Sequence, residues 1–321
     1  MFKIDAFDAE FSRKMPQAEW RQLIAIRSSP TFLAGVLHLA ERLPPFFSHN
    51  AILNKVVTES RRFELLVYSL YLADSRDPAD PRSGLTLANL QRICTERRVA
   101  SPGRVFAILG IMRLGGYLTR AREEGDSRIV RLEPTQRFLD IVEAWNRMIF
   151  ETLDIAAPGD DLVGRHEREP RFGFDMRSNG AEAALAGWHL LDAFPELRTF
   201  VDRDGGWMLL ASIVATTLKE REAGEQRPIA IRLESIGAKL AVSRSHLRRV
   251  LEDAHAAGLL EESPRNGARI IASPRLLATY TTCGACEMAF YRTNALAGRT
   301  RRTASSPDEA VQEGYGSSIV G

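Results

Sequence analysis

Cysteine and lysine are scarce in this chain of 321 residues, and long apolar runs are absent. Three cysteines (Cys94, Cys283 and Cys286) are too few for a disulfide framework. No stretch approaches the roughly 20 consecutive apolar residues that a membrane-spanning helix needs. Residues 1–10 carry three acids and lack the basic-then-apolar order of a signal peptide. The sequence therefore predicts a cytoplasmic protein without disulfides.

Sequence motifs for catalysis or metal binding are missing as well. There is no Gly-rich phosphate loop, and His166-Glu167 lacks the second histidine of a metalloprotease helix. Cys283-Gly-Ala-Cys286 is a lone CxxC, whereas a structural zinc normally takes four ligands. We therefore expect no enzyme, no metal and no cofactor. Cys283 and Cys286 are interpreted as packed helical cysteines, with a redox switch as the alternative.

The positive charge that is present gathers in two islands. Hydrophobic residues make up 45% of the chain and charged residues 26%, as in a globular protein of about two domains. Residues 82–137 carry a net charge of +6 and residues 227–275 of +4, although the whole chain has only +2. Localised positive charge favours a polyanionic partner, because phosphate contacts release counterions. Chance clustering of arginine is the alternative.

Two segments, 101–118 and 243–260, repeat one helical pattern at an offset of 142 residues. Each begins with a serine suited to cap a helix, Ser101 and Ser243, and each reaches a glycine suited to end it, Gly116 and Gly258. Apolar residues between them follow the i, i+3, i+4, i+7 spacing of one buried stripe: Val105, Ile108, Leu109 and Met112, then Leu247, Val250, Leu251 and Ala254.

The flanking segments repeat too. Strand pairs are predicted after each helix, at 117–122 with 127–132 and at 259–263 with 268–272, the second around Asn266-Gly267. A longer and a shorter apolar helix precede each copy, at 63–73 and 87–94 and at 207–219 and 236–240, and helices follow at 138–149 and 276–296. Leu33-Ala-Gly35 and Leu185-Ala-Gly187 extend the similarity upstream. The chain is therefore interpreted as a duplicated unit.

The copy at Leu233–Leu260 resembles the helix-turn-helix and wing entry of bacterial MarR-like winged-helix transcriptional regulators. The residues that carry this resemblance are the turn Leu240-Ala-Val-Ser-Arg244 and the terminal Gly258-Leu-Leu260. It implies binding to double-stranded operator DNA, a possible homodimer built on flanking helices, and a possible small-molecule effector sensed between them. One departure is a turn at Thr95–Ala100 that is four residues longer than its counterpart, Ala241-Val242.

The predicted fold is mostly α with small β-hairpin wings, an α+β tandem winged helix-turn-helix whose pseudo-dimeric duplication is joined by flanking helices. The expected parts are packing helices at 1–62, winged modules at 63–135 and 206–275, connecting helices and linker at 136–205, a helix at 276–298 and a disordered tail at 299–321. The linker is placed at 157–180. The apolar helical stretches 32–47 and 184–200 are assigned to packing between the halves, with a homodimer contact or a ligand cleft as alternatives.

A recognition helix places its N-terminal residues against base edges in the major groove. The second module offers Ser243, Arg244, Ser245, His246, Arg248 and Arg249 on its helix, and Arg265, Asn266 and Arg269 on its wing. The first module offers Ser101 and Arg104 on its helix and Arg120, Arg122, Arg128 and Arg131 on its wing, with Arg97 and Arg98 on its turn. Phe106 and Ala107 stand where the second module has Arg248 and Arg249. We therefore expect the second module to recognise the base sequence and the first to bind mainly the DNA phosphate backbone.

The predicted function is a sequence-specific DNA-binding transcriptional regulator, with repression favoured over activation. Two alternatives remain open: a replication initiator with tandem winged helices, and a winged-helix protein-interaction scaffold of the chromosome-condensation type. The sites bound along a genome would distinguish a promoter regulator from an initiator. A scaffold predicts weak binding without base preference.

Overall fold

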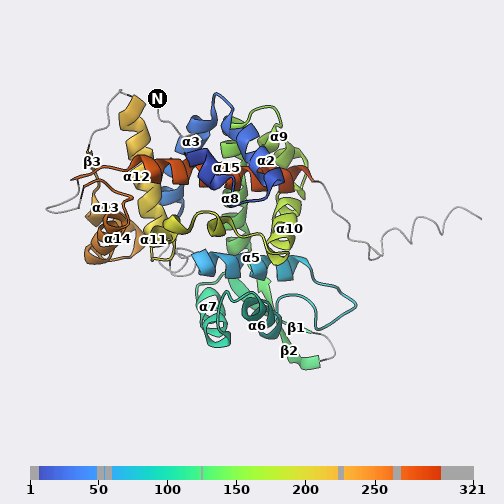
Figure 1. The fold of residues 1–321 in the computed structure, drawn as a ribbon. Coiled ribbons are helices and arrows are strands. Elements are labelled where there is room, and N and C mark those ends of the chain that lie inside the picture. Colours follow the sequence, from blue (N-terminus) through green and yellow to red (C-terminus); the bar gives the residue numbers. More distant parts are fainter. Residues whose placement is uncertain are drawn as a thin grey trace, which may run out of the picture.

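The computed structural model describes residues 7–48, 54, 60–123, 126–222, 228–262 and 269–297, with backbone alone at 122–123, 126–128 and 221–222. The protein is mostly helical with two small two-stranded antiparallel sheets, as the predicted α+β class requires (Figure 1). The predicted tail at 299–321 and the wing residues Arg265 and Asn266 lie outside the described residues.

The first half of the chain runs from a packing layer into a compact module. Its elements are α1 (Asp8–Phe11), α2 (Gln17–Arg27), α3 (Phe32–Phe46), α5 (Ser60–Asp74), α6 (Leu87–Glu96), α7 (Pro102–Leu114), β1 (Leu118–Glu123), β2 (Asp126–Pro134) and α8 (Gln136–Ala156). β1 and β2 form an antiparallel hairpin in which Arg120 faces Leu132 across the ladder. The strands and helices predicted between residues 63 and 149 are all confirmed.

The second half follows the same order with shorter strands. Its elements are α9 (Leu162–Arg168), α10 (Phe172–Leu185), the 3₁₀ turns η2 (Leu190–Asp192) and η3 (Pro195–Leu197), α11 (Arg198–Val201), α12 (Gly206–Glu222), β3 (Ile229–Ala230), α13 (Leu233–Leu240), α14 (Arg244–Ala256), β4 (Arg269–Ile270) and α15 (Pro274–Leu296). Helices α12, α13, α14 and α15 therefore occupy the places of α5, α6, α7 and α8.

The strand pairing of the second half differs from the prediction. The segment 268–272 was expected to pair with 259–263, and among the described residues this pairing is present at Leu260↔Ala272, with a hydrogen bond from the Glu261 N–H to the Ile271 carbonyl at 2.9 Å, but β4 itself pairs with β3. The first half has a matching feature, because Thr86, just before α6, bridges to Arg131 in β2. In both halves, then, the residues before the short helix add a third segment beside the returning strand.

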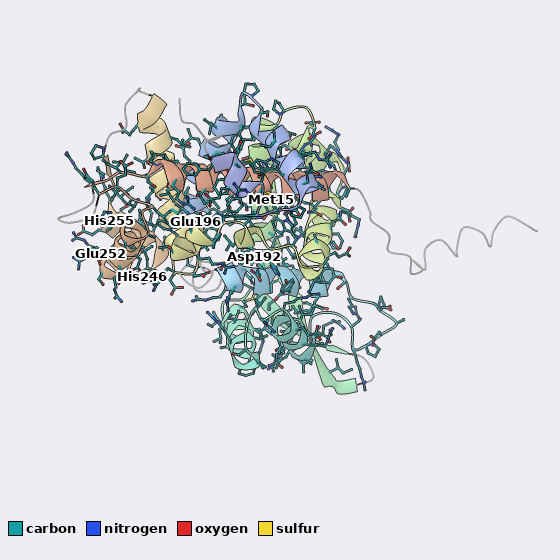
Figure 2. All side chains as sticks on the ribbon, in the orientation of Figure 1. Met15, Asp192, Glu196, His246, Glu252 and His255 are labelled. Atoms are coloured by element: carbon teal, nitrogen blue, oxygen red, sulfur yellow. The ribbon has the colours of Figure 1, made fainter. Side chains whose placement is uncertain are left out.

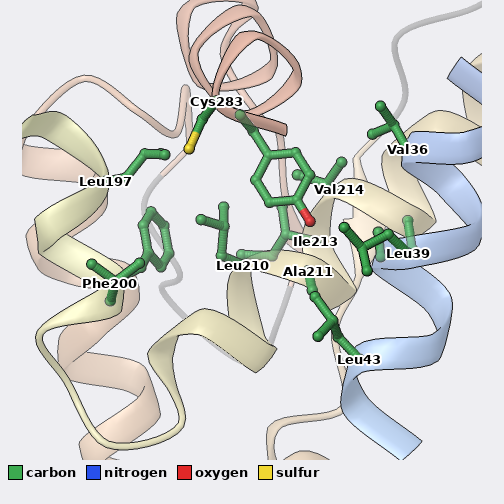
Figure 3. Close-up of a cluster of buried hydrophobic side chains, with 14 of the residues drawn as sticks. Val36, Leu39, Leu43, Leu197, Phe200, Leu210, Ala211, Ile213, Val214 and Cys283 are labelled. Atoms are coloured by element: carbon green, nitrogen blue, oxygen red, sulfur yellow. The ribbon is translucent and has the colours of Figure 1, made fainter. Parts of the chain in front are cut away.

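Two hydrophobic cores lie within the described residues. The smaller core joins α5, α6, α7, both strands of the first hairpin and the start of α8. The larger core joins the N-terminal helices, the rest of α8 and the whole second half. Figure 3 shows part of the larger core, where Leu43 of α3 lies beside Ala211 of α12 and Leu210 of α12 points toward Phe200 of α11.

Two helices, α3 and α10, each pack on helices of both halves of the chain, and they are called the exchanged helices below. α3 packs on α8 of its own half and on α12 of the other half, and α10 packs on both α15 and α5. The close approach of α3 to α8 depends on Gly35, where an added Cβ would lie 2.5 Å from the Cβ of Ala156. This reciprocal arrangement fits a duplicated unit whose copies share their flanking helices.

Two predictions upstream of α12 are wrong. The segment 157–180 is not an exposed linker, because it contains α9 and most of α10 and buries Leu162, Phe172 and Met176. The stretch 184–200 is not one helix, because it breaks into η2, η3 and α11 after α10 ends. Gly187 has φ +110° just beyond that end, whereas Gly35 lies inside α3, so the proposed similarity of these glycines does not hold.

Across the described ranges, no single helix combines the length and apolar character of a bilayer-spanning segment. Helices α2 and α3 reach that level only as a pair, and they bend by 93° at their break. The apolar residues of α3 are largely buried against α8 and α12, including Phe32, Val36 and Leu39.

Candidate nucleic-acid interface

Helix α14 begins at a well-formed cap. The Ser243 hydroxyl accepts a hydrogen bond from the His246 backbone N–H at 3.1 Å, which satisfies one of the unpaired donors of the first turn. Before it, Ala241 adopts the left-handed region with φ +57°, and the Val242 N–H donates to the Gly237 carbonyl at 3.0 Å. An added Cβ on Gly237 would lie 2.6 Å from the Val242 carbonyl oxygen. The turn between α13 and α14 is therefore set by its own backbone.

Helix α7 begins with the same geometry. Ser101 caps it by accepting from the Arg104 N–H at 3.4 Å, and Pro102 occupies the first turn. Arg98 is left-handed with φ +56°, and the Val99 N–H donates to the Cys94 carbonyl at 2.8 Å. Arg98 and Val99 thus correspond to Ala241 and Val242.

The predicted four-residue difference between the two turns is wrong. Helix α6 continues through Glu96, so the first turn spans 97–101, whereas the second spans 241–243. The extra length is two residues, one of which lies between the left-handed residue and the capping serine. Both helices then end alike, at Gly116 with φ +73° and Gly258 with φ +71°, as predicted.

The predicted buried stripes are confirmed in both helices. Because those stripes face the cores, the opposite side of α14 faces solvent and carries Arg244, Ser245, Arg248 and Arg249, all exposed. Two of these arginines have acidic neighbours. Arg244 lies 2.8 Å from Glu234 of α13, and Arg248 lies 3.4 Å from Glu252 one turn along α14. Arg249 makes no ion pair with any residue that the structure describes.

His246 has a different environment from its neighbours. Its ring is half-buried, and Nε2 lies 2.9 Å from the carbonyl oxygen of Asp204, just before α12. A second link joins the same two segments, where Arg203 pairs with Asp253 at 3.0 Å. Figure 2 labels His246, Glu252 and His255 on this side of the molecule. His246 therefore ties α14 to the segment before α12.

The first module presents a less polar helix. Ser101 and Arg104 are exposed at the start of α7, but Phe106 is 65% exposed and Leu114 is 90% exposed on its outer side. These two side chains are the most exposed large apolar residues among those described. The outer side of α7 thus lacks the arginines that α14 carries at equivalent positions.

The wing arginines divide into three groups. Arg120 on β1 and Arg269 on β4 are exposed. The backbones of Arg122 and Arg128 lie in β1 and β2, but their side chains, like Arg265 and Asn266, lie outside the described part of the chain. Arg131, expected to grip phosphates, is only 8% exposed and donates to Glu133 from Nε and Nη2 at 3.2 and 3.0 Å. Arg97 and Arg98 of the turn are exposed.

All three cysteines are free and buried, so the packed-cysteine interpretation of Cys283 and Cys286 in α15 is confirmed. Burial raises the pKa of the Cys286 thiol to about 12 and that of Cys283 well above its ordinary value. Few thiolates are present near neutral pH, which disfavours the redox alternative. Among the residues with described positions, no three His, Cys, Asp or Glu side chains gather as a metal site would require.

The acidic partners of the helix arginines were missed at the sequence level. Glu252 could have been found, because it follows Arg248 by four residues in a predicted helix. Glu234 precedes Arg244 by ten residues and becomes its neighbour only when the turn folds. Comparison of the chain with protein-family models, with curated protein sequences and with solved structures finds no significant match.

Proposed function

We propose that this protein binds double-stranded DNA through two winged helix-turn-helix modules and regulates transcription, most simply by occluding a promoter. The observation that carries the proposal is the outer face of α14. That face presents exposed arginines and a serine at the N-terminal end of a helix whose opposite side is buried, which is the arrangement a major-groove reader needs.

The surrounding elements support the winged interpretation. In each half, a long helix, a short helix and a turn precede the candidate reading helix. A strand segment from before the short helix pairs with a strand that follows the reading helix. A three-segment wing with two helices in this order is the pattern of winged DNA-binding modules. The Thr86↔Arg131 bridge and the β3–β4 pair place the third segment alike in both halves.

The ion pairs on α14 are compatible with phosphate binding. The side chains of Arg244 and Arg248 remain 60% and 62% exposed in these ion pairs. Exposed pairs of this kind contribute only about 0–1 kcal/mol each. A phosphate or a guanine edge can therefore replace Glu234 and Glu252 as the partner at little cost. His246, held by Asp204, positions the helix in this proposal and does not read bases.

The two modules have unequal roles in the proposal. α14 carries the specific contacts through Arg244, Ser245 and Arg248, and Arg249 contacts the phosphate backbone. The exposed Phe106 and Leu114 of α7 have no hydrogen bonds to offer base edges, so the first module contributes backbone contacts through Arg97, Arg98, Arg104 and Arg120.

The test is selection of bound fragments from genomic DNA, followed by affinity measurements with point variants at several salt concentrations. Arg248→Ala is expected to weaken the selected site by about 1–3 kcal/mol if it reads a base. Arg249→Ala is expected to weaken all DNA alike and to reduce the salt slope by about 0.9 if it contacts a phosphate. Arg21→Ala, on the exposed side of α2, is the control and is expected to change neither.

The fragments recovered also discriminate the alternatives. Promoter fragments support a regulator, whereas origin fragments with direct repeats indicate an initiator. Weak binding without base preference indicates a scaffold. Equal losses for Arg249→Ala and Arg21→Ala, or no binding at low salt, would remove α14 as a DNA-binding helix.

A further inference from the structure

A cavity of about 510 Å³ lies between the two hydrophobic cores. Its wall includes Phe138 and Val142 of the smaller core and Met176 and Met208 of the larger core. Helices α5, α8, α10, α12 and α15 all contribute to it. The volume is within the range of about 300–1,000 Å³ that is typical of sites for organic ligands.

Aromatic side chains dominate one part of this wall. Trp145 of α8 lies 5.6 Å from the rings of both Phe46 and Phe63, and Trp188 stacks on Phe290 at 3.8 Å. Trp207 of α12 also lines the cavity. Aromatic faces carry negative electrostatic potential and attract cations as well as apolar groups.

Glu287 of α15 places a carboxyl group beside these rings. The side chain is half-buried and lines the cavity. It makes no hydrogen bond or ion pair with any described residue, and burial alone raises its pKa to about 7. The carboxyl group therefore lies in a mostly apolar part of the cavity, with no described cationic side chain paired with it.

Among the residues that the structure describes, the groups around Glu287 provide no such partner. Val36 and Leu39 come from α3, Trp207 comes from α12, and Gly284 and Met288 come from its own helix. The charge of Glu287 raises the pKa of four neighbouring groups, all on α15 and all neutral at pH 7: Tyr280, Cys283, Cys286 and Tyr291.

Two of the arginines in the wall are paired with other acids. Arg177 lies 3.5 Å from Asp74, and Arg198 lies 3.1 Å from Asp192. Arg61, Arg198 and His189 lower the pKa of Glu64, whereas burial alone shifts the pKa of Glu287. Among the described residues Glu287 therefore has aromatic neighbours and no cationic partner, although further arginines, Arg61, Arg97 and Arg98, also line the cavity.

We propose that this cavity binds an organic cation with aromatic or bulky apolar substituents, with Glu287 as its counter-ion and Trp145, Trp188 and Trp207 around its apolar groups. A carboxylate in a mostly apolar cavity is less well solvated than one in bulk water, and a bound cation relieves that cost while its substituents contact the apolar wall. The inference is independent of DNA binding, because its test uses the ligand alone.

The test measures binding of tetraphenylphosphonium and tetraphenylborate, two ions of the same shape and opposite charge, to the full-length protein by calorimetry. Tryptophan fluorescence gives a second readout, because three of the four tryptophans line the cavity. The phosphonium is expected to bind at one site per chain and at least tenfold more tightly than the borate. A neutral apolar site would bind both ions alike, and a site built on the arginines would prefer the borate. Either result would overturn the proposal.

Two further arms identify the counter-ion. The carboxylate fraction of a group with a pKa near 7 rises about tenfold between pH 6 and pH 8, so the affinity for the phosphonium is expected to rise about tenfold over that interval. Glu287→Gln is expected to abolish this pH dependence and to weaken binding at pH 8, whereas the matched variant Glu64→Gln is expected to retain both. Because the wild-type pH series needs no variant, a pH-independent affinity contradicts the role of Glu287 even if Glu287→Gln does not fold.

Discussion

At the scale of single residues, the two capping serines provide a direct comparison between the modules. Each accepts one backbone N–H, Ser243 at 3.1 Å and Ser101 at 3.4 Å. Replacing a capping serine with alanine costs about 0.5–2 kcal/mol, because the donor it satisfied is left to water. Ser243→Ala is therefore expected to lower the free energy of unfolding by about 1 kcal/mol, and Ser101→Ala by less, since its bond is longer.

Urea denaturation followed by circular dichroism measures both losses. Ser235→Ala provides the control, because this exposed serine lies inside the first turn of α13 and caps no helix. If Ser235→Ala destabilises the protein as much as Ser243→Ala, the cap at Ser243 contributes nothing of its own.

Local features of this kind could be predicted from the sequence. The caps, the buried stripes and the helix-ending glycines Gly116 and Gly258 depend on residues within one or two helical turns. The environment of His246 could not be predicted, because its partner comes from elsewhere in the chain. His246 meets the carbonyl of Asp204 only when α14 packs beside the segment before α12. The partner of Arg131 is local, since Glu133 lies two residues along the same strand and side chains at that spacing share one face.

At the scale of secondary-structure elements, the packing of α3 on α8 depends on a single missing side chain. A Cβ on Gly35 would lie 2.5 Å from the Ala156 Cβ and 2.9 Å from its Cα, too close for either helix to stay in place. Overpacking of a core typically costs about 1–3 kcal/mol, so Gly35→Ala is expected to destabilise the protein by that amount.

Gly110 provides the matched substitution. It lies inside α7, and an added Cβ would meet nothing within 4 Å. Alanine is favoured over glycine by about 0.5–1 kcal/mol in a helix interior, so Gly110→Ala is expected to stabilise the protein. Thermal unfolding of both variants measures the contrast. Two changes of the same sign would contradict the close approach of α3 to α8.

Elements formed by short or charged segments were harder to predict. Helices α9 and α10 lie in a stretch rich in glycine, proline and charge, which is typical of a linker. Their charges form pairs one turn apart, such as Arg165 with Glu169 and Arg171 with Asp175, which support a helix with few apolar residues. The pairing of β4 with β3 was also missed, because strands of two residues are too short for an alternation of apolar and polar side chains to be recognised in the sequence.

The outer faces of α7 and α14 differ, although the local geometry of the two helices is the same. The same cap, stripe and ending glycine position both helices, so the residues on the outer face are free to differ without altering the fold. α14 has arginines there, whereas α7 has Phe106 and Leu114. Different partners for the two modules, or different parts of one DNA site, can follow from this single difference.

At the scale of the whole molecule, the two hydrophobic cores differ in size and are joined by helices that pack on both halves. Among described residues the smaller core has 19 buried apolar side chains and the larger has 51, and the exchanged helices α3 and α10 hold the halves together. The aromatic cavity lies where the cores meet, so the contact between them is incomplete. No single segment of the sequence encodes that cavity, because its wall comes from helices far apart in the chain, among them α3, α5, α8, α10, α12 and α15.

Local opening of a protein requires less free energy where fewer apolar contacts are lost. The smaller core is therefore expected to open at lower urea concentration than the larger core. Each core contains a buried cysteine that reports its opening, Cys94 in the smaller core at 0% exposure and Cys283 in the larger core at 1%. Because both are closed to reagent in the folded protein, a difference in their labelling measures opening and not static access.

The measurement is modification of the thiols during short exposures to increasing urea, with the modified peptides identified by mass spectrometry. Cys94 is expected to react at a lower urea concentration than Cys283, and Cys286, at 7% exposure in the same helix, is expected to follow Cys283. Simultaneous reaction of all three would mean that the halves unfold as one cooperative unit. In that case the exchanged packing of α3 and α10, and not the separate cores, determines the stability of the molecule.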